Sequence, residues 1–109
     1  MTGPVTNPVR VCRRNRFEKL PPDTKLVTRP SRWGNDHHVD PGNKTPAEHA
    51  RVVELLRLDL IADPGRCAET RTHLAGWNLA CACRLDWPCH ADLLLRIARG
   101  EDPADYRTH

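Results

Sequence analysis

The sequence predicts a small α/β fold, a single domain in which a short sheet of about three strands is packed with two to three helices. Short alternating or apolar segments occur both early and late in the chain, at residues 9–13, 24–28 and 78–83. Segments with apolar residues at helical spacing lie between and after them. This order is typical of a compact α/β domain, and 109 residues are too few to fill a second core.

The first two strands are predicted from alternation and from the turns around them. Residues 1–8 hold two prolines and no apolar pattern, so we expect a disordered lead-in before a domain spanning residues 9–99. Residues 9–13 alternate apolar and polar side chains, and a second strand at 24–28 follows a Pro-Pro-Asp turn. Residues 31–43, rich in Gly, Pro and Asn, are expected to form a long loop, and such loops are usually functional or disordered.

The clearest helix follows this loop. Thr45 is a good N-cap, Pro46 suits the first helical position, and Glu48 completes a capping box. Apolar residues recur at helical spacing up to Ile61, and the Asp-Pro-Gly stretch at residues 63–65 is expected to end the helix. A second, weaker helix is predicted over about residues 66–73.

The last third of the chain predicts a buried strand and a final helix. Residues 78–83, Asn-Leu-Ala-Cys-Ala-Cys, are short and almost wholly apolar, which favours a central strand. A polar loop leads to a helix that begins near Cys89 or His90 and ends at Gly100. Residues 100–109 are expected to form a polar C-terminal tail.

Composition and charge exclude several protein classes. No apolar run approaches the roughly 18–20 residues that span a bilayer, and no signal peptide is present, so we expect a soluble, cytoplasmic protein. The five cysteines are an odd number in a chain without an export signal, which argues against a disulfide framework. Residues 1–35 hold 8 basic and 2 acidic side chains, a net charge of +6, so binding of nucleic acid through this basic third is one hypothesis.

A cluster of thiols and an imidazole, Cys81, Cys83, Cys89 and His90, allows three interpretations. The four side chains could bind zinc, although their spacing is not that of the usual paired ligands. Alternatively, Cys89 is a nucleophile at a helix N-terminus and His90 its base. The third interpretation is structural, with the strand cysteines filling a tight core. No cofactor is assigned, and zinc enters only through the first interpretation.

Three segments of the chain, in order, resemble a small family of unknown function, DUF4326. They are residues 29–35, 74–83 and 88–94, which read Arg-Pro-Ser-Arg-Trp-Gly-Asn, Leu-Ala-Gly-Trp-Asn-Leu-Ala-Cys-Ala-Cys and Pro-Cys-His-Ala-Asp-Leu-Leu. The resemblance runs from about residue 9 to 99. It implies a phage or actinobacterial origin and no established reaction. Ala82 stands where the family has Trp, and Asp36 where it has Pro, so a pocket closed by this loop would bind differently here or be inactive.

The loop before the first helix carries side chains suited to an anionic ligand. Arg29 and Arg32 can grip phosphate or carboxylate, Trp33 offers a stacking face, and Gly34 permits close approach of the backbone. The alternative is that Trp33 plugs the core while the arginines face water. The candidate ligand-binding residues are Arg29, Ser31, Arg32, Trp33, Gly34, Asn35 and Asp92.

The leading hypothesis is a phage-encoded domain that binds a nucleotide-like or anionic ligand between the loop at residues 29–35 and the turn at residues 83–92. A transferase or hydrolase reaction with Cys89 and His90 is one form of this hypothesis, and binding without catalysis is another. The rival hypothesis is a phage interaction protein, in the host cytoplasm, that binds and modulates a host macromolecule. No membrane partner is expected.

Overall fold

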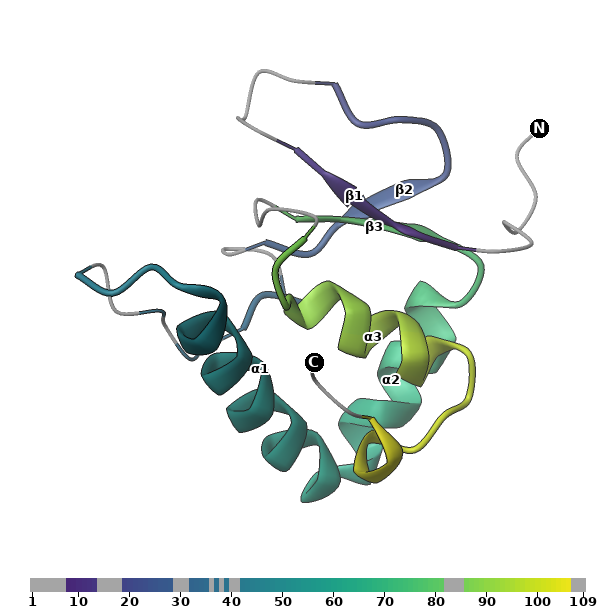
Figure 1. Cartoon of the computed structure of the whole chain (residues 1–109). Helices are drawn as coiled ribbons and strands as arrows, with labels where there is room; N and C mark the ends of the chain where they lie inside the picture. The colour runs from purple at the N-terminus through teal and green to yellow at the C-terminus, as the bar shows by residue number, and fades with distance from the viewer. Residues whose placement is uncertain are drawn as a thin grey trace.

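The fold is described from a computed structural model, which covers residues 8–13, 19–28, 32–35, 37, 39, 42–81 and 86–106 (Figure 1). Strands β1 (Arg10–Cys12) and β2 (Thr24–Leu26) precede helices α1 (Pro46–Ile61) and α2 (Pro64–Leu74). Strand β3 (Asn78–Cys81) then leads to α3 (His90–Ala98) and a 3-10 turn, η1 (Pro103–Asp105). The protein is therefore the compact α/β domain that the sequence predicts, a three-stranded parallel sheet with three helices.

The third strand lies at the centre of the sheet, as predicted from its apolar sequence. The strand order is β1-β3-β2, and β3 is parallel to both neighbours. Leu79, Ala80 and Cys81 are each 0% exposed. Small apolar side chains suit this strand because it has a neighbour along each edge and no exposed face.

The strand registers turn two basic residues toward the helices. Arg10 of β1 and Lys25 of β2 both lie opposite Leu79, so the three side chains share one face of the sheet. Leu79 packs in a cluster with Leu94 and Leu95 of α3, and Figure 1 shows the helices on that side. The basic first third of the chain is therefore not simply a solvated surface.

Helix α1 begins as its capping signals predict. The Thr45 hydroxyl accepts a hydrogen bond from the Glu48 backbone N–H at 3.2 Å, and Pro46 occupies the start of the helix. The Glu48 carboxylate pairs with Arg51 one turn later, at 2.7 Å. Within the described part of the chain, neither α1 nor any other helix is long and apolar enough to cross a membrane.

The Asp-Pro-Gly stretch at residues 63–65 follows the end of α1, as predicted, but it also begins α2. The Asp63 carboxylate accepts a hydrogen bond from the Arg66 backbone N–H at 3.1 Å, and so acts as the N-cap. Pro64 fits the first helical position because the N–H that it lacks would have no partner there. Helix α2 therefore begins two residues before the predicted start, and α1 and α2 form a tight helical corner.

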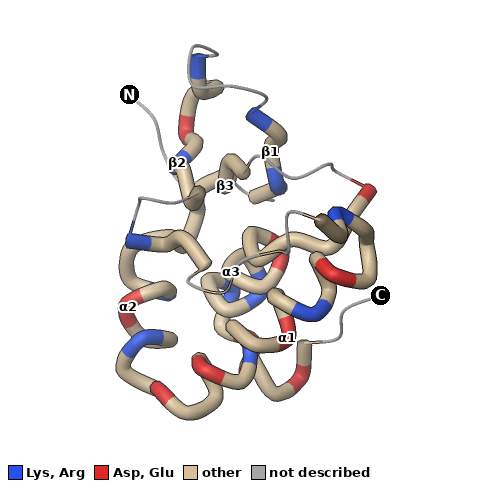
Figure 2. The backbone as a smooth tube through the Cα atoms, turned by 90° about the vertical axis from the view of Figure 1, so that its left-hand side faces the viewer, with Lys and Arg blue, Asp and Glu red and all other residues tan. Residues whose placement is uncertain are grey.

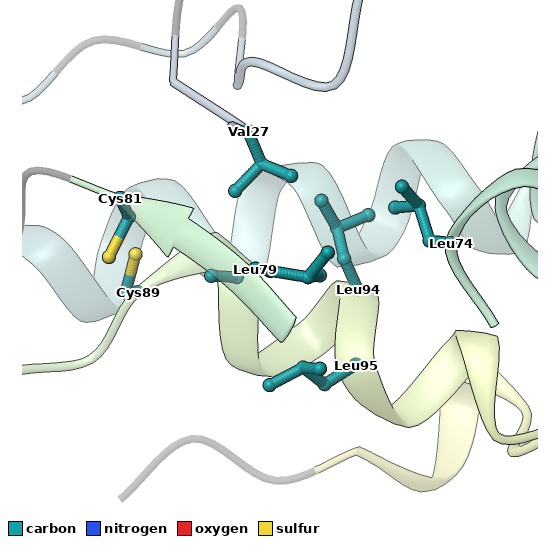
Figure 3. Packing of buried hydrophobic residues seen from close by; sticks show 8 residues of the cluster. Val27, Leu74, Leu79, Cys81, Cys89, Leu94 and Leu95 are labelled. Atoms are coloured by element: carbon teal, nitrogen blue, oxygen red, sulfur yellow. The ribbon is translucent and has the colours of Figure 1, made fainter. Parts of the chain in front are cut away.

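Helix α3 lies between the sheet and the other two helices, because its apolar side chains contribute to two clusters. The first cluster joins α3 to β3 and to the ends of β2 and α2 (Figure 3); its buried members are Val27, Leu74, Leu79, Cys81, Cys89, Ala91, Leu94 and Leu95. The second joins α3 to α1 and α2 through Val53, Leu56, Leu60, Cys67, Leu93 and Ile97.

The chain after α3 packs against the second cluster. Gly100 adopts φ +101°, a conformation that glycine tolerates, and redirects the chain. Pro103 is buried, and the ring of Tyr106 packs against the second cluster. Arg57 of α1 donates hydrogen bonds to the carbonyls of Pro103 and Ala104 at 3.2 and 3.3 Å. Residues 101–106, part of the predicted polar tail, thus close the core.

Candidate functional site

The loop that follows β2 carries Trp33 and Arg32 against α2. The Trp33 ring is partly buried against the first cluster, and its centroid lies 5.9 Å from that of the His73 ring. The Arg32 guanidinium lies 4.6 Å from the Trp33 ring centroid, a cation–π distance. Trp33 therefore combines the two roles considered from the sequence, because it packs on the core and also presents a face to the loop's own arginine.

Arg32 is held by an ion pair that a ligand could replace. Its Nη2 lies 2.8 Å from Glu69 Oε2, and the two side chains are 56% and 58% exposed. An ion pair this exposed to water contributes little stability, at most about 1 kcal/mol. Arg32 can therefore exchange Glu69 for another anion at low cost.

A cavity of about 400 Å³ lies beside this loop, between it and the start of α2. It combines two guanidinium groups, two carboxylates and one aromatic face, from Arg32, Trp33, Asp63, Gly65, Arg66 and Glu69. Sequence reasoning found the first two of these residues and missed the other four, which belong to α2 and its N-cap. The capping signal of Asp63 and Pro64 would have placed a helix N-terminus here, but nothing in the sequence placed it beside Arg32.

Gly34 and Asn35 are buried and fix the same loop to α1. The Asn35 side-chain amide donates to the Val52 carbonyl at 2.9 Å, and its oxygen accepts from the His37 backbone N–H at 2.9 Å. His37 also binds Asp59 of α1, with Nε2 2.7 Å from Oδ2. Both polar ends of the Asn35 amide thus bond the protein's own backbone, and the loop has a rigid base from which Arg32 and Trp33 project.

The turn before α3 brings the predicted nucleophile and base together. Cys89 Sγ lies 3.7 Å from His90 Nδ1, within the range of a sulfur hydrogen bond. His90 Nε2 lies 2.7 Å from the Val27 carbonyl oxygen, which can only accept, so Nε2 carries the proton and Nδ1 is left to accept from the thiol. The same bond joins the turn to the end of β2. Cys89 is, however, only 1% exposed, so a substrate would need this turn to open.

Asp92 is engaged by a buried arginine. Arg10 Nη1 donates to Asp92 Oδ2 at 3.0 Å and to the Trp87 carbonyl at 2.9 Å, and the Arg10 side chain is only 6% exposed. Burial raises the pKa of Asp92 by more than Arg10 lowers it. Burial lowers the pKa of Arg10, but Asp92 and the thiols Cys89 and Cys81 outweigh this and raise it. From the sequence, Arg10 is only one of the basic residues of the first third. The alternation at residues 9–13 favours burial of Val9, yet Val9 is 54% exposed, whereas the Arg10 side chain on the opposite face of β1 is 6% exposed.

The structure brings together some of the predicted site residues and not others. Arg32 and Trp33 line the cavity, whereas none of its described lining residues comes from the turn that carries Cys89, His90 and Asp92. The candidate ligand-binding residues Arg29 and Ser31 and the candidate zinc ligand Cys83 lie outside the described part of the chain, as do Asp36 and Ala82, where the sequence departs from the family pattern. The described residues contain no group of three or more His, Cys, Asp or Glu side chains arranged to hold a metal. The predicted zinc set includes Cys83, so that hypothesis stays a prediction.

Comparison with known proteins identifies a family, but no match among curated proteins or solved structures. A family profile described as "Domain of unknown function (DUF4326)" matches residues 10–100, most of the chain and all three helices. No curated protein and no solved structure matches the sequence significantly. The family assignment that the three sequence segments indicate is therefore confirmed.

Proposed function

Because the chain belongs to the DUF4326 family, whose description assigns no function, we propose one from the geometry alone: the domain binds a nucleotide-like anion in the cavity beside Arg32 and Trp33. The observation that carries this proposal is the position of the Arg32 guanidinium, at a cavity wall and over the face of an aromatic ring. The sequence hypothesis places the second wall of the pocket at the turn of residues 83–92, whereas this proposal places it at the start of α2.

The mixed chemistry of the cavity favours a nucleotide over a bare anion. Arg32 and Arg66 have planar, charged forks that match phosphate oxygens. Trp33 can stack on a base once Arg32 turns from the ring to a phosphate. Asp63 and Glu69 can accept hydrogen bonds from ribose hydroxyls or base amino groups. A volume of about 400 Å³ suits a small molecule of this kind.

Calorimetric titration of the full chain with adenosine triphosphate and with inorganic pyrophosphate tests this proposal. Arg32→Ala should weaken binding at least about tenfold, because a hydrogen bond to a charged group is worth about 1.5–3 kcal/mol. Arg96→Ala is a matched control. Arg96 lies on α3, is 53% exposed and pairs with Glu101 at 3.2 Å. It removes the same charge and should leave the affinity unchanged. Equal losses in both variants, or no binding by the wild-type protein, would contradict the proposal.

Binding to nucleic acid is a weaker candidate, because two of the described basic residues of the first third, Arg10 and Lys25, are engaged within the fold. Lys and Arg gather around β1 and β2 (Figure 2). However, Arg10 pairs with Asp92, and Lys25 Nζ donates to the His73 carbonyl at 2.7 Å and lies 4.5 Å from the Trp77 ring centroid. The discriminating measurement is salt dependence, because affinity for nucleic acid would fall steeply as salt rises.

The rival hypothesis is that the protein binds a host macromolecule, and such a partner would contact an exposed surface rather than the cavity. Leu58 and Ile61 are 50% and 40% exposed on α1 and are apolar residues that such a partner could cover. Recovery of a stoichiometric host protein that Arg32→Ala does not affect would favour this hypothesis over the small ligand.

A further inference from the structure

Two buried thiols face each other at the end of the sheet. Cys81 is the last residue of β3, and Cys89 is the N-cap of α3. They are 0% and 1% exposed and belong to the same apolar cluster. Figure 3 shows their sulfur atoms pointing toward one another across the gap between strand and helix. Two facing thiols from separate elements are the arrangement that an intramolecular disulfide requires.

Groups that promote thiol chemistry surround this pair, although its environment is otherwise apolar. His90 Nδ1 lies 3.7 Å from Cys89 Sγ and can take its proton, because Nε2 is held by the Val27 carbonyl. The Arg10 guanidinium interacts electrostatically with both thiols. A nearby positive charge favours the thiolate, which is the reactive form of cysteine. Cys67 differs: its buried Sγ donates to the Leu60 carbonyl at 3.3 Å, and burial raises the pKa of this thiol.

We infer that Cys81 and Cys89 form a reversible oxidation site, at which a peroxide oxidises the two thiols to a disulfide. Since both thiols are buried, the oxidant must be small, and hydrogen peroxide meets that requirement. This inference does not depend on the proposed ligand.

The reaction balances with one peroxide per disulfide. The Cys89 thiolate attacks one peroxide oxygen and the O–O bond breaks. Hydroxide leaves and takes the proton held by His90 to form water, so that Cys89 becomes a sulfenic acid. The Cys81 sulfur then attacks the Cys89 sulfur, the S–S bond forms and the S–O bond breaks. The released hydroxide takes the Cys81 proton as a second water, and a dithiol reductant reverses the change.

The disulfide would join β3 to α3. It would also leave Cys89 without the thiol proton that it donates to His90 Nδ1. The oxidation state of these two cysteines would therefore affect the turn at residues 86–89, which leads into α3. Disulfides of this kind in reduced compartments are usually transient or redox-sensing rather than structural.

The test is peroxide treatment of the reduced full chain, followed by alkylation, trypsin digestion and mass spectrometry. The expected product is a monomer that has lost two hydrogens and in which peptide 72–84 is linked to peptide 85–96. Cys81→Ser and Cys89→Ser should each abolish this product. Cys83 shares peptide 72–84 with Cys81, so Cys83→Ser must retain the link. Cys67→Ser is the control for an unrelated buried thiol and must also retain it.

Circular dichroism of the serine variants covers the risk that one of them does not fold. In folded Cys81→Ser that is treated with peroxide and then denatured in the presence of dimedone, an adduct on Cys89 is expected, because the sulfenic acid has lost its resolving thiol and dimedone reaches this buried residue only after unfolding. A link through Cys83 or Cys12, a disulfide between two chains, or thiols that stay reduced in the folded wild-type protein would overturn the inference. Bound zinc that protects both thiols from peroxide would overturn it as well.

Discussion

At the scale of single residues, the same side-chain type serves different ends in different positions. Arg10 and Arg32 are both early arginines, yet Arg10 is 6% exposed and tied to Asp92, whereas Arg32 is 56% exposed and tied to Glu69. Removing one partner of a buried pair leaves an uncompensated charge, while an exposed pair exchanges partners readily. Arg10 therefore stabilises the turn before α3, and Arg32 is the arginine suited to bind a ligand.

Glu69→Gln should strengthen the binding of adenosine triphosphate about two- to fivefold. The substitution removes the carboxylate that competes for Arg32, and an exposed pair of this kind is worth up to about 1 kcal/mol. Glu101→Gln is the matched control because Glu101 pairs with Arg96 in the same exposed manner. Titration calorimetry measures both variants. Weaker binding in Glu69→Gln would show that Glu69 contributes more to binding the ligand than it takes away by competing for Arg32, and would contradict this prediction.

At the scale of elements, the sequence predicted the helices and the central strand but not how α2 begins. Thr45 and Pro46 mark the start of α1 because capping is a local property. Asp63 and Pro64 carry the same kind of signal, but directly after a helix the same residues also indicate a helix end. The cavity could not be predicted because it depends on tertiary packing, which brings the loop of Arg32 to Glu69, 37 residues later in the chain.

Asp63→Ala should lower the free energy of unfolding by about 1 kcal/mol, since it removes the N-cap of α2. Asp63→Ser should restore most of this stability, because a serine hydroxyl can also accept the Arg66 N–H. Asp105→Ala removes another exposed carboxylate, which caps no helix, and should change stability by less than about 0.5 kcal/mol. Urea unfolding measures all three. An Asp63→Ala protein as stable as the wild type would contradict the observed cap.

At the scale of the whole molecule, the chain after α3 returns to α1 and packs against the core. Tyr106 packs on the cluster shared by the three helices, and burial, aided by the Asp92 carboxylate, raises its pKa from 10.0 to about 12. Between these values the folded protein retains a proton that the unfolded chain releases. The phenol's contribution to stability is therefore fully present below pH 10 and is lost as the pH rises toward 12.

Spectrophotometric titration checks this directly, because the chain has a single tyrosine. In the folded protein the phenolate absorbance should rise with a midpoint near pH 12, accompanied by loss of the folded signal in circular dichroism. In denaturant the midpoint should fall to about 10, the value of an unperturbed phenol. A midpoint near 10 in the folded protein would mean that Tyr106 is not packed against the core.

The location of the ligand site can be checked by mapping amide and indole chemical shifts of the nitrogen-15-labelled chain during titration with adenosine triphosphate. The largest shifts are expected at the Gly65 and Arg66 amides and at the indole N–H of Trp33, since these three residues line the cavity. Shifts concentrated at the His90 and Asp92 amides would instead place the ligand at the start of α3, away from the cavity.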